Sequence, residues 1–279
     1  MQQTTDLDTT STPGHFDRTY VYLNAYPSGT GNSKPGARAD IKSHFNEGLG
    51  LINYVGHGSP FKISDESVLI DSDAGTLTNG SRLPVFIAAS CDVGKFNDPT
   101  VQSLGERLVM APNAGAIGVI SATEQAFSSD NSLLNKFLYQ QMFRRDDVVV
   151  GADTLRGVGT YHLPVSAALL SAKIDAPGTN EINNSKYQYM GDAATRMNAP
   201  HQWADLALLD ANGAPVTSLA RGQVVTFHGR VLASPGGALL PFTGVASLLV
   251  EDSAPELNTG RNGSTSCLSH YYDVNYRYA

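Results

Sequence analysis

The 279-residue chain contains only two cysteines, Cys91 and Cys267. Two cysteines cannot form a disulfide framework, and we expect these two to lie in different domains and to remain unpaired. No apolar run approaches the roughly 20 residues that a membrane-spanning helix needs. The first twelve residues have neither a basic start nor an apolar centre, so they do not form a signal peptide. If the protein is exported, its signal lies outside this chain.

The chain is also poor in charge. Charged residues make up 16% of it, and 19 basic residues against 26 acidic ones give a net charge of −7. No cluster of lysine and arginine interrupts this balance, which argues against nucleic acid as a partner. Apolar residues make up 41% of the chain, so we expect a folded globular protein. The 27 glycines, with abundant Ser, Thr and Asn, are compatible with an extracellular bacterial protein.

Hydrophobic runs and helical periodicity alternate through the first 200 residues. Residues 1–14 read as a disordered lead-in, followed by a domain over residues 15–200. Strands are predicted at 17–23, 51–55, 84–89, 116–121 and 187–190. Helices are predicted at 37–49, 131–143 and 165–173, with another that starts at Asp98-Pro99. This alternation is typical of an α/β fold with a mostly parallel sheet.

The pattern changes after residue 200. Strand-like runs at 203–209, 224–231 and 245–251 are separated by turn sequences, and helical periodicity ends. We interpret residues 201–279 as a partial β-sandwich, because a complete one needs about seven strands. The first domain likewise has only one predicted strand before residue 51. We therefore expect the chain to be an internal piece of a longer protein that lacks N-terminal strands.

Two apolar runs end in reactive side chains between small residues. The first is followed by Gly56-His57-Gly58, and the second by Ser90-Cys91. Adjacent parallel strands would bring His57 and Cys91 to the carboxyl edge of one sheet, where open α/β folds build their sites. A histidine beside a thiol suits a cysteine nucleophile, and the N–H groups of Gly58 and Cys91 could bind an oxyanion. Alternatively, Cys91 is a buried small residue and His57 a loop residue.

The segments around His57 and Cys91 also resemble those of a known family. Residues 51–59 and 83–99 look like the His and Cys segments of the gingipain-type cysteine peptidases, and the similarity continues through residues 103–106, 115–120, 131–143 and 189–192. Residues 242–244 and 250–252 resemble the sandwich that follows the catalytic domain in the sortases of type IX secretion. The resemblance implies a caspase-like α/β sheet with helices on both faces.

The resemblance further implies hydrolysis or transpeptidation of peptide bonds, with His57 as general acid/base and Cys91 as nucleophile. It places part of a substrate pocket after the third strand, at Ser121, Ala122, Thr123 and Glu124. The substrate would be a protein or peptide. The location would be extracellular, or the bacterial cell surface or outer membrane. Alternatively, the chain is a truncated or degenerate relative of these peptidases and acts as a non-catalytic interaction module on the cell surface.

The sequence contains little that indicates a metal site. Asp71, Asp73 and Gly75 suggest a calcium loop, but the glutamate that an EF-hand loop requires does not follow. We favour a solvated loop there, although secreted peptidases of this kind can bind calcium. His162 and His201 have no Cys or carboxylate neighbours at ligand spacing, so no zinc site is expected. We expect no resident cofactor.

Overall fold

The computed structural model describes residues 11–12, 16, 18–144, 148–150, 153–155, 163–175, 181–197, 203–218, 222–233, 237–241 and 243. The chain divides into two compact units, Met1–His201 and Gln202–Ala279, which are taken separately below. Within the described residues, no helix is both long and apolar enough to cross a membrane.

A four-stranded sheet forms the centre of the first unit. It contains β1 (Leu51–Val55), β5 (Val85–Ala89), β6 (Gly118–Ala122) and β9 (Tyr187–Gly191), in the order β1-β5-β6-β9. The first three strands are parallel, and β9 runs antiparallel to β6. β5 and β6 are buried along their whole length, which explains their continuous apolar sequences.

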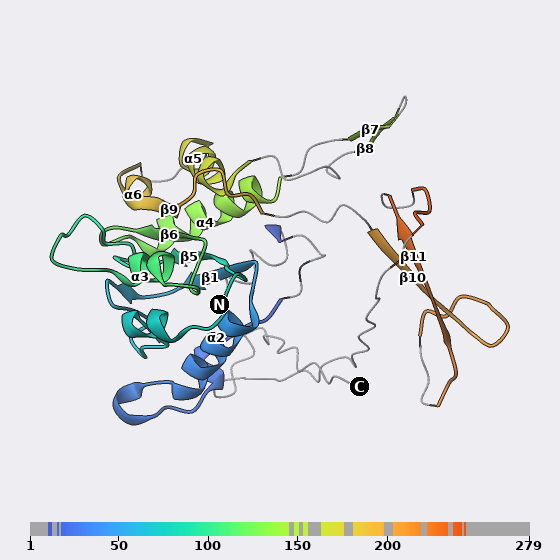
Figure 1. The fold of residues 1–279 in the computed structure, drawn as a ribbon, viewed down its shortest axis with the longest axis horizontal. Helices are drawn as coiled ribbons and strands as arrows, with labels where there is room; N and C mark the ends of the chain where they lie inside the picture. The colour runs from blue at the N-terminus through green and yellow to red at the C-terminus, as the bar shows by residue number, and fades with distance from the viewer. Residues whose placement is uncertain are drawn as a thin grey trace, which may run out of the picture. The chain divides into compact units, whose positions relative to one another are not determined.

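Helices cover both faces of this sheet. Alternate β5 residues pack on opposite sides, Phe86 with α2 (Pro35–Glu47) and α3 (Leu104–Met110), and Ile87 with α4 (Ser128–Met142) and α5 (Val165–Asp175). Figure 1 shows α4 and α5 above the sheet and α2 below it. Each face therefore has its own apolar core, and the predicted α/β fold class is confirmed.

Short elements complete the first unit. The strands β2 (Gly58–Ser59), β3 (Lys62–Ile63) and β4 (Leu69–Ile70) form a small antiparallel sheet directly after β1. The remaining short elements are η1 (Leu23–Ala25), η2 (Thr30–Asn32), η3 (Asp71–Thr76), β7 (Val148–Val150), β8 (Asp153–Leu155) and α6 (Glu181–Lys186).

Two predictions for this unit are wrong. Residues 18–22 contain no strand, and the one-turn helix η1 begins at Leu23. Helix α3 begins at Leu104 rather than at Asp98-Pro99, because Ser103 and Glu106 form a capping box at its N-terminus. The Asp98 carboxylate instead accepts hydrogen bonds from the backbone and hydroxyl of Thr100 in a local turn.

In the second unit, β10 (Trp203–Leu209) and β11 (Thr226–Leu232) form an antiparallel pair. Their positions agree with the strands predicted at 203–209 and 224–231. The run at 245–251 lies outside the described residues, so the expected partial sandwich stays a prediction.

Candidate active site

The two segments singled out in the sequence lie side by side at the carboxyl edge of the sheet. In the parallel pairing of β1 with β5, Val55 is opposite Ala89. His57 lies two residues after Val55, and Cys91 lies two residues after Ala89. The two residues therefore follow in-register ends of neighbouring strands. Neighbouring strands are about 4.8 Å apart, so the loops that carry the two residues begin beside each other.

Contact between the two loops is close at Gly58. A Cβ atom built there would lie 2.2 Å from Ser90 Oγ, 2.8 Å from the Cys91 carbonyl oxygen and 2.8 Å from Val93 Cγ2. Only a residue without a side chain fits in this space. The loop that carries His57 therefore packs directly on the backbone of Cys91.

The backbone of His57 is fixed while its side chain is exposed to solvent. Its carbonyl oxygen accepts a hydrogen bond of 2.7 Å from the Tyr54 hydroxyl and one of 2.8 Å from the Ser64 N–H. Burial raises the pKa of Tyr54 above its ordinary value, so this hydroxyl remains a donor at neutral pH. Tyr54 and Ser64 thus hold the turn from which the imidazole projects.

Cys91 is half-buried, and its thiol contacts the backbone of Ala126. The Sγ atom donates to the Ala126 carbonyl oxygen and accepts from the Ala126 N–H, each at 3.3 Å. The next residue, Asp92, has a left-handed φ of 55°, and its N–H donates to the Glu124 carbonyl at 3.2 Å. The loop after β5 is therefore joined to the loop after β6.

The strand end is also held from the side of β9. The Tyr187 hydroxyl donates to the Ser90 carbonyl at 3.4 Å, and burial raises the pKa of Tyr187 above its ordinary value. The Ser90 hydroxyl is buried and has no hydrogen-bond partner within the described residues. The carbonyl preceding the thiol is thus anchored, whereas the neighbouring hydroxyl fills space beneath Gly58.

The four residues expected to line the substrate pocket differ in exposure. Ser121 and Ala122 are buried in β6, and Thr123 is buried just beyond it. The Thr123 N–H and hydroxyl both donate to the Lys186 carbonyl, at 3.0 and 3.2 Å. Glu124 is exposed, so it is the member of this set whose side chain reaches solvent.

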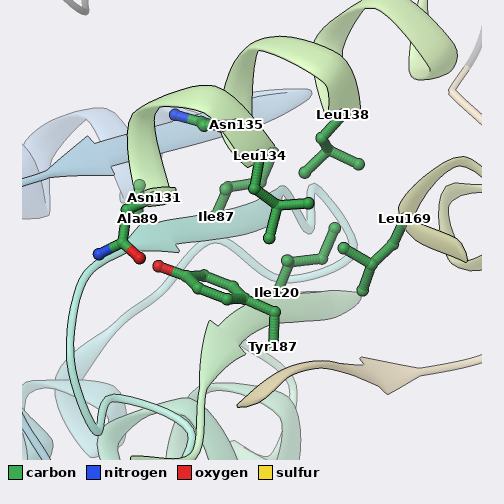
Figure 2. A pocket seen from close by; sticks show the side chains of 9 residues that line it. All are labelled: Ile87, Ala89, Ile120, Asn131, Leu134, Asn135, Leu138, Leu169 and Tyr187. Atoms are coloured by element: carbon green, nitrogen blue, oxygen red, sulfur yellow. The ribbon is translucent and has the colours of Figure 1, made fainter. Parts of the chain in front are cut away.

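A small cavity lies between the sheet and α4, on the side of the sheet that α5 also covers. Its volume is about 10 Å³, and its lining includes Ile87, Asn131 and Leu138. Figure 2 shows Asn131 and the Tyr187 hydroxyl directed toward each other near Ala89. A space of this size holds about one water molecule, so this cavity does not accept a substrate side chain.

The acidic residues of η3 are engaged with basic side chains. Asp73 is buried, and its carboxylate contacts Arg38 at 2.9 Å and Lys42 at 3.0 Å, and accepts from the Ile70 N–H. Across the described part of the chain, no three His, Cys, Asp or Glu side chains gather as a metal site would require.

Comparison with known proteins identifies the family. The sequence profile of peptidase family C25 matches residues 1–198 of the 279 in the chain. The chain belongs to peptidase family C25. This is the gingipain family of cysteine peptidases, as the segments around His57 and Cys91 predicted.

Solved structures of gingipains are similar to this C25 chain. The complex of the pro- and mature domains of RgpB from Porphyromonas gingivalis is 16% identical, with a TM-score of 0.44, over 70% of this chain and 53% of that one. The Arg-specific cysteine proteinase gingipain R is 17% identical, with a TM-score of 0.45, over 70% of this chain and 52% of that one. The chain thus spans about half the length of these structures. No curated protein matches it significantly.

Sequence reasoning did not find several residues that hold the site of this C25 chain. Tyr54 lies three residues before His57, and its aromatic ring suited a strand without indicating its hydroxyl contact. Ala126 acts through its backbone, which leaves no trace in residue type. Tyr187 reaches the Ser90 carbonyl from the far end of the domain, and no local pattern connects it to Cys91.

Proposed function

We propose that this chain carries the catalytic dyad of a cysteine endopeptidase, with Cys91 as nucleophile and His57 as general base and acid. The observation that supports it best is the packing of Gly58 on the Cys91 carbonyl at the in-register ends of β1 and β5. A dyad needs its two side chains held in a fixed relative geometry. Close backbone contact supplies that fixation.

In the proposed reaction, His57 takes the thiol proton and the thiolate attacks the carbonyl carbon of the scissile peptide bond. The resulting oxyanion accepts hydrogen bonds from the N–H groups of Gly58 and Cys91. The C–N bond then breaks, His57 gives its proton to the leaving amine, and a thioester to Cys91 remains. Water activated by His57 hydrolyses this thioester. An incoming amine in place of water would give sortase-like transpeptidation.

Glu124 and its neighbours are proposed to contact the substrate next to the cleaved bond, because they follow β6 beside the Cys91 loop. The family supports a location outside the cell or on the bacterial surface, where gingipain-type peptidases would meet protein substrates.

A non-catalytic interaction module is the second candidate. The contact of the Cys91 thiol with Ala126, rather than with the imidazole, favours it. Catalytic hydrogen bonds are often long or misaligned before substrate binds, so this contact is also compatible with a peptidase. The two functions differ in the reactivity of Cys91 toward a peptide-directed electrophile.

The test is covalent labelling of the 279-residue chain by a panel of peptidyl acyloxymethyl ketones, followed by mass spectrometry of the intact protein and its peptides. We expect one label, on Cys91. Cys91→Ala should abolish labelling, and His57→Ala should slow it by about a hundredfold or more, the usual contribution of general acid–base catalysis.

Cys267→Ala is the matched control, because it removes the other thiol of the chain. We expect it to label at the parent rate. Equal labelling of both cysteines, or full labelling in Cys91→Ala, would contradict the peptidase proposal and favour the interaction module. Adding glycinamide to an assay with a peptide ester substrate separates the two reactions, since transpeptidation gives the amide product and hydrolysis gives the acid.

A further inference from the structure

The loop at residues 123–127, between β6 and α4, separates Cys91 from α6. On one side, Glu124 contacts Asp92 and Ala126 contacts the Cys91 thiol. On its other side the loop contacts α6, where Lys186 Nζ donates to the Gln125 carbonyl at 2.7 Å. Asn183 Oδ1 accepts from the Phe127 N–H at 2.8 Å. Helix α6 therefore holds the segment that contacts the thiol.

One peptide group connects Asn183 with Cys91. The Ala126 carbonyl, which accepts from the thiol, and the Phe127 N–H, which donates to Asn183, belong to the same peptide unit. A trans peptide is planar, so its C=O and N–H point in opposite directions. Fixing the N–H toward Asn183 therefore fixes the direction of the carbonyl toward the sulfur. Donation by the N–H also polarises the carbonyl and strengthens it as an acceptor.

The Asn183 side chain is itself held in one orientation. It is 0% exposed, and its Nδ2 donates to Asn131 Oδ1 at 3.0 Å. A flipped amide would point a donor at the Phe127 N–H and an acceptor at Asn131 Oδ1. Leaving such groups unpaired in a buried site costs about 1–3 kcal/mol each. The Phe127 N–H, which can only donate, and Asn131 Oδ1 together determine which end of the Asn183 amide meets the loop.

We infer that Asn183 is a positioning residue for the nucleophile, acting through the Ala126–Phe127 peptide group to hold the Cys91 sulfur. This inference deepens the proposed function and rests on it only for the effect on acylation. The hold on the thiol is a property of the folded chain whether or not the chain cleaves peptides.

The neighbouring residue provides a matched control. Asn184 has the same side chain and is 2% exposed, but neither of its amide atoms has a hydrogen-bond partner within the described residues. Asn183→Leu and Asn184→Leu therefore make the same chemical change one residue apart in α6. Only the first removes the acceptor of the Phe127 N–H.

The experiment measures the infrared S–H stretching band of Cys91 in a Cys267→Ala background, where Cys91 has the only thiol. A hydrogen-bonded S–H absorbs at lower frequency than a free one. We expect Asn183→Leu to move the band to higher frequency, because the Ala126 carbonyl is no longer held toward the sulfur. The rate of acylation by a peptidyl electrophile should change by about three- to tenfold, the equivalent of one hydrogen bond. Asn184→Leu should change neither.

A third variant separates positioning from stability. Asn183→Asp keeps an acceptor for the Phe127 N–H while burying a charge, so it should lower the melting temperature yet leave the S–H band near its parent position. If Asn183→Leu does not fold, Asn183→Ala is measured in its place. An unchanged band in the folded Leu or Ala variant would overturn the inference. A shifted band without any acylation in the parent would retain the positioning role and reject the peptidase proposal.

Discussion

The packing at Gly58 gives the sharpest test of the site. An added methyl group in Gly58→Ala would meet three atoms at 2.2–2.8 Å, whereas carbon atoms prefer separations of about 3.5–4.0 Å. The two loops must therefore separate by about 1 Å. Overpacking of this kind costs about 1–3 kcal/mol. For a domain of this size, about 2 kcal/mol lowers the melting temperature by roughly 4–8 °C.

The effect on reactivity should exceed the effect on stability. The displaced loops carry His57 and Cys91, and a misplacement of 1 Å can slow a reaction by about a hundredfold. We expect peptidyl labelling of Cys91 to slow by that order in Gly58→Ala under conditions where the variant is fully folded. Calorimetry and labelling of the same sample measure both quantities.

Two further variants isolate the cause. Gly75→Ala is the matched control, since no atom lies within 4 Å of a Cβ built there, and it should leave stability and labelling almost unchanged. Adding Ser90→Ala to Gly58→Ala removes the nearest clashing atom but leaves the contacts with Cys91 and Val93, so recovery should be partial. A Gly58→Ala protein with parent stability and parent labelling would refute the contact between the two loops.

Two other predictions concern stability. Burial raises the pKa of Asp73, but hydrogen bonds from Arg38, the Ile70 N–H and Lys42 outweigh it and hold the pKa below its ordinary value. The ionised Asp73 carboxylate therefore contributes fully to folding stability above about pH 4, and this contribution is lost as the pH falls below that. The melting temperatures of Asp73→Asn and the parent should accordingly converge in acid. A constant difference down to pH 2 would contradict this. Ser103→Ala should lower the melting temperature by about 2–4 °C through loss of the α3 cap, worth about 1 kcal/mol. If Asp98→Ala lowered the melting temperature more than Ser103→Ala, the assignment of Ser103 as the N-cap of α3 would be wrong.

The core strands of the first unit could be predicted from sequence because burial on both faces leaves a local pattern. The run at 51–55 coincides with β1, and the runs at 84–89 and 116–121 overlap β5 and β6 within two residues. Each run is nearly continuous in apolar residues and is bounded by glycine, proline or polar residues. The parallel pairing of β1 with β5 followed from the length of the segment between them, which is long enough for a crossover connection.

Short elements could not be predicted in this way. The strands β2, β3 and β4 have two residues each, too few for any periodicity to appear. The start of α3 was misplaced although its signal was present, since Ser103 and Glu106 have capping-box spacing. Asp98-Pro99 resembled a helix start but formed a separate turn. A local sequence pattern indicates the residues that could cap a helix. Which of them does so depends on how the helix packs on the sheet.

The candidate site also has parts that the sequence could predict and parts that it could not. The placement of His57 and Cys91 at one edge of the sheet followed from the ends of two strands, which are local features of the sequence. The hydrogen bond between Phe127 and Asn183 joins residues 56 positions apart, and that between Tyr187 and Ser90 joins residues 97 apart. Such contacts depend on the folded arrangement, and half of their atoms belong to the backbone, so no residue pattern reports them.

Burial also bears on where substrate recognition can occur. Side chains within β6 are buried on both faces of the sheet, so in the proposed peptidase Ser121 and Ala122 would influence a substrate only through the backbone that follows them. The chain first reaches solvent at Glu124, and Phe127 at the far end of the same loop is 62% exposed. The loop that meets the solvent is thus the one whose Ala126 backbone contacts the thiol. Changes in its sequence should therefore alter substrate preference and thiol position together, which limits how far one can be tuned without the other.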